Sequence, residues 1–228
     1  MRLSLLIIVV LVIAAVDWAA VAKGWKKIEY FAKPATMVIL FITLAVAGGF
    51  GAIALICFGL GVIFSLAGDI FIMLSNRWFT AGLGAFLLAH VSYIIGLNSP
   101  LGEASPLWAV IIGIILALAT ARVLRPILTG VREKGQGKLV VPVMAYGTII
   151  TIMLLSAILT IYRTDWKTSA TGMVSLGAIL FYFSDIILAW YKFVRPIQNG
   201  RLMNMITYHL GQIALISGVI IQFGHPFR

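Results

Sequence analysis

Long apolar stretches separated by short polar or glycine-rich gaps run along the whole chain. A stretch of about 20 apolar residues is long enough to cross the hydrocarbon core of a bilayer as a helix. The predicted spans are Leu3–Ala22, Pro34–Ala47, Ala52–Leu74, Thr80–Leu97, Leu107–Leu124, Val140–Tyr162, Ala170–Val194 and Met203–Phe223. We therefore expect an all-α integral membrane protein, a bundle of about eight transmembrane helices in which residues 1–228 form a single transmembrane domain.

The first two spans need separate arguments. The first follows Met1-Arg2 and ends in Ala20-Val21-Ala22, as a cleavable signal peptide would. Its length and the interfacial pair Asp17-Trp18 favour a retained helix, with Asp17 facing the lipid headgroups. Pro34 fits the first turn of the short second span, where its missing N–H does no harm. Gly48-Gly49-Phe50-Gly51 predicts a tight return to the third span, or the two spans pack as one bent hairpin.

Composition narrows the class of protein. The chain is 62% hydrophobic and only 11% charged, whereas about a quarter of the residues in soluble domains are charged. The net charge of +10 does not indicate a nucleic-acid partner, because the basic residues lie in the gaps between apolar runs, where they orient a membrane protein. Cys57 is the single cysteine, so we expect neither an intramolecular disulfide nor a cysteine metal site.

Basic residues gather on one predicted side of the membrane. Thirteen of the seventeen lie there: Lys23, Lys26, Lys27, Lys33, Arg77, Arg122, Arg125, Arg132, Lys134, Lys138, Lys192, Arg195 and Arg201. The other four are Arg2, Arg163, Lys167 and Arg228. This excess predicts that the basic side is cytoplasmic and that both termini lie on the outer side. We expect the membrane to be the inner or plasma membrane of the cell, with the active site opening to the cytoplasmic face.

Two aspartates lie inside apolar runs. Asp69 follows Ser65 and Gly68 in the third span, and Asp185 follows Ser184 in the seventh. An aspartate at the centre of a membrane helix costs about 2.5–3.5 kcal/mol, so a matched pair indicates function. If the two helices approach closely, one carboxyl keeps its proton while the other ionises, which makes an acid and a base. In the alternative, each aspartate only bonds helix ends or the neighbouring serine hydroxyls.

Other polar residues are expected at similar depth. Tyr146, Tyr208 and His209 lie in the half of the bilayer nearer the basic side, and His90 lies close to the midplane, which predicts a cavity that opens to the cytoplasmic face. His90 and Tyr93, at i and i+3, suit a hydrogen-bonded pair beside that cavity.

A weak internal repeat relates the two halves of the chain. His90 follows Asp69 by 21 residues and His209 follows Asp185 by 24, each on the next span. The spacing predicts a parallel repeat of two four-span units. Both histidines and both aspartates can ligate metals, but no tight ligand spacing is present, so we predict no metal site.

At the predicted cytoplasmic edge, Lys33 opens the second span. A basic rim over an acidic and apolar cavity suits a ligand that has a phosphate head and an acyl or alkenyl tail. The basic residues other than Lys33 are explained as well by membrane topology.

The residues resemble the YhhN family of membrane lysoplasmalogenases. The resemblance rests on Lys33-Pro34, Ser65 to Asp69, Gly82 to Tyr93, Tyr146, and Phe183 to Phe193, in that order over nearly the whole chain. It implies hydrolysis of the vinyl ether of 1-alkenyl lysophospholipids to a fatty aldehyde and glycerophosphoethanolamine or glycerophosphocholine. It also implies that Asp69 and Asp185 are the catalytic pair.

Two neighbouring aspartates are suited to the chemistry of vinyl ether hydrolysis. Vinyl ether hydrolysis needs a proton donor and a carboxylate, as glycoside hydrolysis does, and it requires no cofactor. We expect the substrate-binding residues to be Lys33, His90, Tyr93, Tyr146, Tyr208 and His209. Two alternatives stay open: a proton- or cation-coupled transporter that uses the same aspartates, and a lipid hydrolase that cleaves a different bond.

Overall fold

The computed structural model describes residues 3–100, 102 and 105–224, and all the regular elements of that part of the chain are helices. The long helices are α1 (Leu3–Lys23), α2 (Lys26–Thr43), α3 (Ile53–Leu74), α4 (Phe79–Leu97), α5 (Pro106–Glu133), α6 (Val140–Leu159), α7 (Thr168–Ala189) and α8 (Gly200–Phe223). Short helical segments are η1 (Leu44–Gly48), η2 (Asn76–Trp78), η3 (Gly137–Leu139), η4 (Thr160–Tyr162) and η5 (Trp190–Val194). With these extensions, eight helices in the described ranges are long and apolar enough to cross a membrane, which confirms the predicted class.

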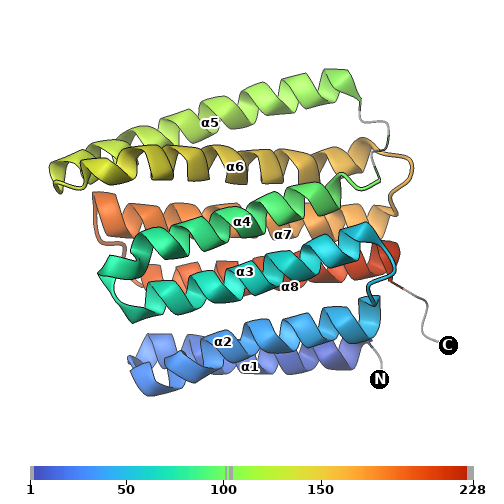
Figure 1. The fold of residues 1–228 in the computed structure, drawn as a ribbon, viewed down its shortest axis with the longest axis horizontal. Coiled ribbons are helices and arrows are strands. Elements are labelled where there is room, and N and C mark those ends of the chain that lie inside the picture. The colour runs from blue at the N-terminus through green and yellow to red at the C-terminus, as the bar shows by residue number, and fades with distance from the viewer. Residues whose placement is uncertain (1–2, 101, 103–104, 225–228) are drawn as a thin grey trace.

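Successive helices alternate in direction, so the start of α1 and the end of α8 lie at the same end of the bundle (Figure 1). The hairpins α3–α4 and α7–α8 occupy the middle, α1 and α2 lie along one edge, and α5 and α6 lie along the other. Most of the core is built from the middle hairpins with α2 and α6. The two aspartate-bearing helices, α3 and α7, therefore both belong to the centre of the bundle.

Glycines allow α7 and α8 to pack closely. A Cβ on Gly177 of α7 would lie 2.6 Å from the backbone nitrogen of Leu215, and one on Gly211 of α8 would lie 2.9 Å from that of Phe181. Small residues are favoured where membrane helices meet, because they let the backbones approach. The close contact brings the polar face of α8 against the helix that carries Asp185.

Two predicted helix boundaries are wrong. The helix α2 begins at Lys26, so Pro34 lies inside it and not in its first turn. The helix α5 continues past Leu124 to Glu133 and contains Pro126. In both cases charged residues ended the apolar run in the sequence, but the backbone stays helical where those side chains reach an aqueous end or a buried partner. The predicted tight return after α2 is present, and Gly49 has a φ of 70° there.

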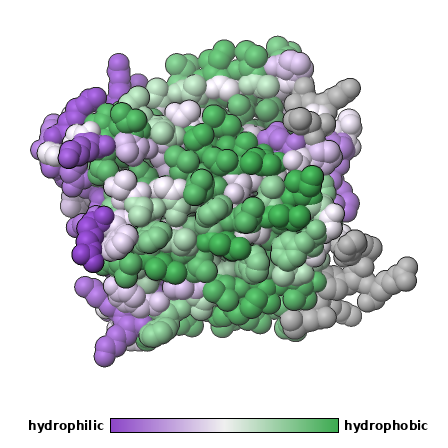
Figure 2. Space-filling model, in the orientation of Figure 1, coloured by the Kyte–Doolittle hydropathy of each residue, from purple (hydrophilic) through white to green (hydrophobic). Residues whose placement is uncertain are grey.

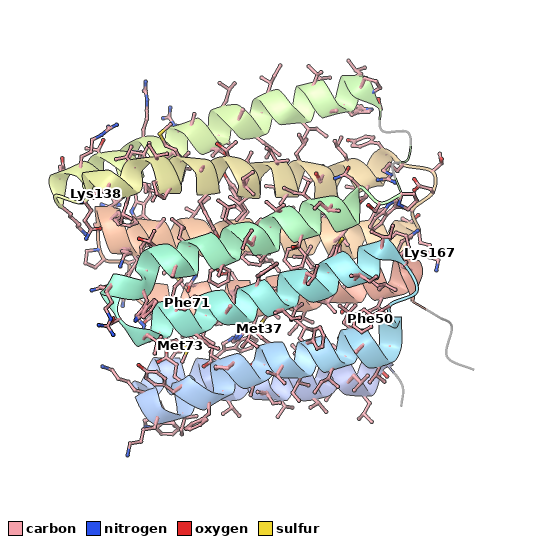
Figure 3. All side chains as sticks on the ribbon, in the orientation of Figure 1. Met37, Phe50, Phe71, Met73, Lys138 and Lys167 are labelled. Atoms are coloured by element: carbon pink, nitrogen blue, oxygen red, sulfur yellow. The ribbon has the colours of Figure 1, made fainter. Side chains whose placement is uncertain are left out.

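Polar side chains gather at one end of the bundle (Figure 2). This end contains the connections α1–α2, α3–α4, α5–α6 and α7–α8, with Lys138 labelled there and Lys167 labelled at the opposite end (Figure 3). Of the four basic residues predicted for the opposite side, Arg2 and Arg228 lie outside the described residues. We call the end that contains Lys138 and these four connections the basic end. Its cytoplasmic location stays a prediction.

At the opposite end, Arg163 joins two connections. Its buried guanidinium donates to the carbonyls of Leu97, at 3.0 Å, and Pro100, at 2.7 Å. It also donates to both carboxylate oxygens of Asp165, at 3.1 and 2.8 Å, and these hydrogen bonds lower the pKa of Asp165. Arg163 thus holds the segment after α4 against the segment before α7.

Removing the hydrogen bonds of Arg163 should destabilise the fold. We expect Arg163→Ala to lower the free energy of unfolding in detergent by at least the value of one charged hydrogen bond, about 1.5–3 kcal/mol. The matched control is Arg122→Ala, because Arg122 is exposed. Thermal unfolding of both variants measures the effect. Equal midpoints for the two variants would contradict the structural role of Arg163.

Candidate active site

A cavity of about 410 Å³ enters the bundle from the basic end, between α2, α3, α4, α7 and α8. Its mouth is lined by residues near the starts of α2 and α8, including Lys26, Glu29 and Arg201, and an Arg201 nitrogen lies 2.6 Å from a Glu29 oxygen. Met73 of α3 also lines the cavity and lies on the side of α3 that faces α2 (Figure 3). Both Asp69 and Asp185 are part of its wall.

Asp69 forms a buried ion pair. Its Oδ1 lies 2.9 Å from Nζ of Lys33, and the hydroxyl of Tyr208 donates to its Oδ2 at 2.7 Å. The Asp69 and Lys33 side chains are only 1% and 6% exposed, so the pair is shielded from bulk water. The preceding Gly68 leaves room for the ring of Phe86, which a Cβ would approach to 2.6 Å. Helices α2, α3 and α8 thus meet at one carboxylate.

Asp185 has a different set of partners. The hydroxyl of Tyr146 donates to its Oδ2 at 2.5 Å, and Nε2 of His90 lies 3.3 Å from the same oxygen. The His90 Nε2 also lies 2.9 Å from the Tyr146 hydroxyl. Since that hydroxyl gives its proton to Asp185, its oxygen accepts from an Nε2–H of His90. With 14% of its side chain exposed, Asp185 is more accessible than Asp69.

The two carboxylates share a cavity wall, but they do not pair with each other. Among the hydrogen bonds of the described chain, Asp69 is bonded from α8 and Asp185 from α6. Their environments are separate, since one has an ammonium group beside it and the other a phenol and an imidazole. This arrangement distinguishes the two groups chemically.

The predicted hydrogen-bonded pair of His90 and Tyr93 is wrong. The Tyr93 hydroxyl donates to Oε1 of Gln212 at 2.7 Å, and Gln212 donates to Oγ of Ser65 at 2.9 Å. Tyr93 is fully buried and is not among the residues that line the cavity. On α4, His90 faces Asp185 while Tyr93 faces α3 and α8.

His209 also lies away from the cavity. Its Nδ1 accepts a hydrogen bond from Nε1 of Trp18 at 3.1 Å and lies 4.0 Å from Oδ2 of Asp17. Asp17 is fully buried, so the expectation that it faces the headgroups is wrong. The reason is that α1 packs against α8 and turns this side of the helix inward.

Asn204 is a residue of the cavity wall that was not predicted from the sequence. Asn204 donates to both the carbonyl and the hydroxyl oxygen of Ser184, at 2.8 and 2.9 Å, beside Asp185. Helical spacing carried a signal, because Arg201, Asn204 and Tyr208 recur at i, i+3 and i+7 on one face of α8. Within the described residues, no group of three or more His, Cys, Asp or Glu side chains is arranged to hold a metal ion.

Residues 28–219 match the family model described as the YhhN family, a segment that contains Lys33, both aspartates and Tyr208. The chain belongs to the YhhN family. All the partners of Asp69 and Asp185 described above lie in this YhhN segment, whereas α1 precedes it.

Curated relatives of this YhhN protein include proteins named lysoplasmalogenases. Human "Lysoplasmalogenase TMEM86B" is 32% identical over 139 residues, which cover 60% of this chain and 52% of that protein. Bovine "Lysoplasmalogenase TMEM86A" is 29% identical over 160 residues, covering 68% and 61% of the two chains. The mouse TMEM86B protein is 42% identical over 79 residues, covering 34% and 30%. The matched part spans about half the length of the human TMEM86B protein, and no solved structure matches.

The buried ion pair should contribute strongly to stability. Lys33→Met leaves Asp69 buried without its cation, and removing one partner of such a pair costs about 3–5 kcal/mol. We expect the double variant Lys33→Met, Asp69→Leu to lose less than the sum of the two single changes. Chemical unfolding in detergent measures all three.

Lys27→Met is the matched control, because Lys27 is exposed on the same helix. If Lys33→Met cost no more than Lys27→Met, or if the two single changes added without coupling, the ion pair would not stabilise the bundle.

Proposed function

We propose that this protein hydrolyses the vinyl ether bond of 1-alkenyl lysophospholipids. The observation that carries the proposal is the pair of carboxylates, Asp69 and Asp185, that line one cavity with different partners. Paired carboxylates in unlike environments divide the roles of acid and base. The names of the curated relatives support the same reaction.

Asp69 suits the role of the ionised carboxylate, which acts as the base. The ammonium group of Lys33 and the hydroxyl of Tyr208 both stabilise a negative charge on it. In the reaction it stabilises the positive charge that develops on the substrate and accepts a proton from the attacking water. Asp69 can do both because it lines the cavity and the Lys33 ammonium group stabilises its charge.

Asp185 suits the role of the general acid. It has no Lys or Arg partner among the ion pairs of the described residues, and it is the more accessible of the two carboxyls. When one carboxyl oxygen accepts from Tyr146, the other is free to carry a proton toward the substrate. After each turnover, the proton that Asp69 has taken from water returns to Asp185 through the cavity that both line, while Tyr146 and His90 hold the other oxygen of Asp185 in place.

The steps balance without a cofactor. Asp185 gives its proton to the β carbon of the vinyl ether, whose double-bond electrons form the new C–H bond and leave an oxocarbenium ion. Water adds to the α carbon and loses a proton to Asp69. The resulting hemiacetal collapses to a fatty aldehyde and a glycerophospho head-group alcohol, as a proton moves from its hydroxyl to the leaving oxygen.

The cavity mouth suits a zwitterionic head group. Lys26 and Arg201 offer positive charge to a phosphate, and Glu29 offers negative charge to a choline or ethanolamine. Lys33, expected from the sequence to bind phosphate, is instead paired with Asp69 deeper in the wall. We therefore assign phosphate binding to the mouth and not to Lys33.

Aldehyde release tests the reaction. The purified protein should release fatty aldehyde from a 1-alkenyl lysophospholipid, and Asp69→Asn and Asp185→Asn should each lose at least about 100-fold in rate, because acid–base groups contribute about 10²–10⁴. Glu133→Gln is the control, since Glu133 is exposed at the end of α5 and is not among the residues that line the cavity. Thermal unfolding verifies that each variant is folded.

No aldehyde from a folded parent protein would overturn this proposal. Proton flux in liposomes would then favour the transporter alternative, while release of a product other than aldehyde would indicate hydrolysis of a different bond. Full activity in both aspartate variants would return these residues to a structural role.

The hydroxyl of Tyr146 should also matter. Tyr146→Phe removes the donor to Asp185 and leaves the ring in place, so we expect the rate to fall about tenfold, the value of one hydrogen bond of about 1.4 kcal/mol. The pH dependence of kcat should shift as well, because Asp185 loses a partner. Tyr191→Phe, at the cavity wall without a hydrogen bond to either aspartate in the described chain, is the control.

A further inference from the structure

A narrow apolar groove continues from the cavity into the other half of the bundle. It has a volume of about 70 Å³ and lies between α4, α5, α6 and α7, where its walls include Val123 and Leu124 of α5, Gly147 and Ile150 of α6, and Ile186 of α7. Ile72, Phe86, Asp185 and Leu188 line both the groove and the cavity. Asp185 is the carboxyl group at this junction, since Asp69 lines only the cavity.

The polar groups of the groove are already bonded. The hydroxyls of Thr120 and Tyr182 lie 2.7 Å apart, and Thr120 also lies 2.9 Å from the hydroxyl of Thr151. Tyr146 donates to Asp185. The groove therefore offers a bound molecule mainly carbon surface, whereas the cavity mouth offers charges.

Helix α5 forms the outer wall of the groove and has a largely exposed, lipid-facing surface. Helix α5 is the least buried of the eight candidate spans in the described chain, with only 6% of its most apolar stretch buried. It lies at the edge of the bundle and diverges from α6 toward the end opposite the basic end (Figure 1). The residues it gives to the groove, at positions 120, 123, 124 and 127, form one helical face.

We propose that the groove holds the hydrocarbon chain of a single-chain lysophospholipid whose head group lies at the cavity mouth. The proposal rests on the proposed function for its substrate class. A polar mouth and an apolar groove that join at a carboxyl group match a molecule with a polar head, a reactive bond and a tail. The groove is too small for a whole chain, so it holds the first carbons and the rest extends past α5 into the bilayer.

This orientation has a chemical consequence. In a 1-alkenyl ether the β carbon lies on the chain side of the α carbon, so a chain in the groove brings the β carbon to Asp185. The bond to oxygen then points toward the mouth and Asp69. The binding geometry thus gives the same division of acid and base as the ion pair of Asp69 does.

Photo-crosslinking tests the groove independently of the reaction. The probe is a 1-alkyl lysophosphocholine, which lacks the vinyl ether, with a diazirine on the fourth to sixth carbon of its chain. It is added to the protein in nanodiscs and the labelled peptides are identified by mass spectrometry. We expect labelling near Leu124 and Ile150 that excess unlabelled alkyl lysolipid prevents. Labelling that is confined to the outer faces of α1 and α2, or that excess lipid does not reduce, would overturn the proposal.

A filled groove should exclude the chain. A Cβ on Gly147 would lie 3.0 Å from the Leu124 side chain, so Gly147→Leu should fill the space and reduce the specific labelling about tenfold. Gly84→Leu is the control, because a Cβ on the exposed Gly84 meets nothing within 4 Å. Leu124→Trp, which blocks the groove from α5, serves if Gly147→Leu does not fold. Parent-like labelling in the folded groove variant would overturn the proposal.

The two proposals fail in different ways. If the probe labels the groove but the parent protein releases no aldehyde, the chain site stands and the reaction is wrong. If aldehyde is released but the groove is not labelled, the reaction stands and the chain site is wrong. Asp185→Asn should label as the parent does, because its side chain keeps its size.

Discussion

The bundle depends on giving partners to two carboxylates inside a membrane-spanning structure. Asp69 takes an ammonium from α2 and a hydroxyl from α8, and Asp185 takes a hydroxyl from α6 and faces an imidazole from α4. Each carboxylate therefore joins three helices. Since a carboxylate without partners is costly in this environment, the helices that meet at each one must hold their rotation and depth. Both carboxylates form part of the wall of the cavity, and Asp185 also forms part of the wall of the groove.

Much of this arrangement follows from the sequence. Apolar runs about as long as a bilayer is thick predicted the eight spans, and an aspartate in two of them predicted where the polar centre lies. The partners were harder to predict, because they depend on how each helix is rotated about its axis. Tyr93 illustrates this, since three residues on α4 correspond to about 60° of rotation. That difference is enough to turn it toward Gln212 while His90 faces Asp185.

Charged residues inside helices caused the other differences. Lys33 looked like the first residue of a span, but it lies within α2, because the ion pair with Asp69 offsets the cost of burying its charge. The weak repeat that paired Asp69 with His90 and Asp185 with His209 does not describe the contacts. His90 serves the aspartate of the other hairpin, and Tyr208, the neighbour of His209, serves Asp69. A pattern read along one chain cannot reveal such crossed contacts, so the parallel repeat itself stays a prediction.

The crossed contacts bear on how the protein is made. Helices enter a membrane in chain order, and both partners of Asp185 belong to helices that precede α7. Asp69 is in the opposite position, because Lys33 arrives before it but Tyr208 belongs to the last helix. From the synthesis of α3 until that of α8, the newly inserted chain carries a carboxylate whose second partner does not yet exist. Assembly is therefore completed at its final helix, because Asp69 gains its second partner only when α8 has been inserted.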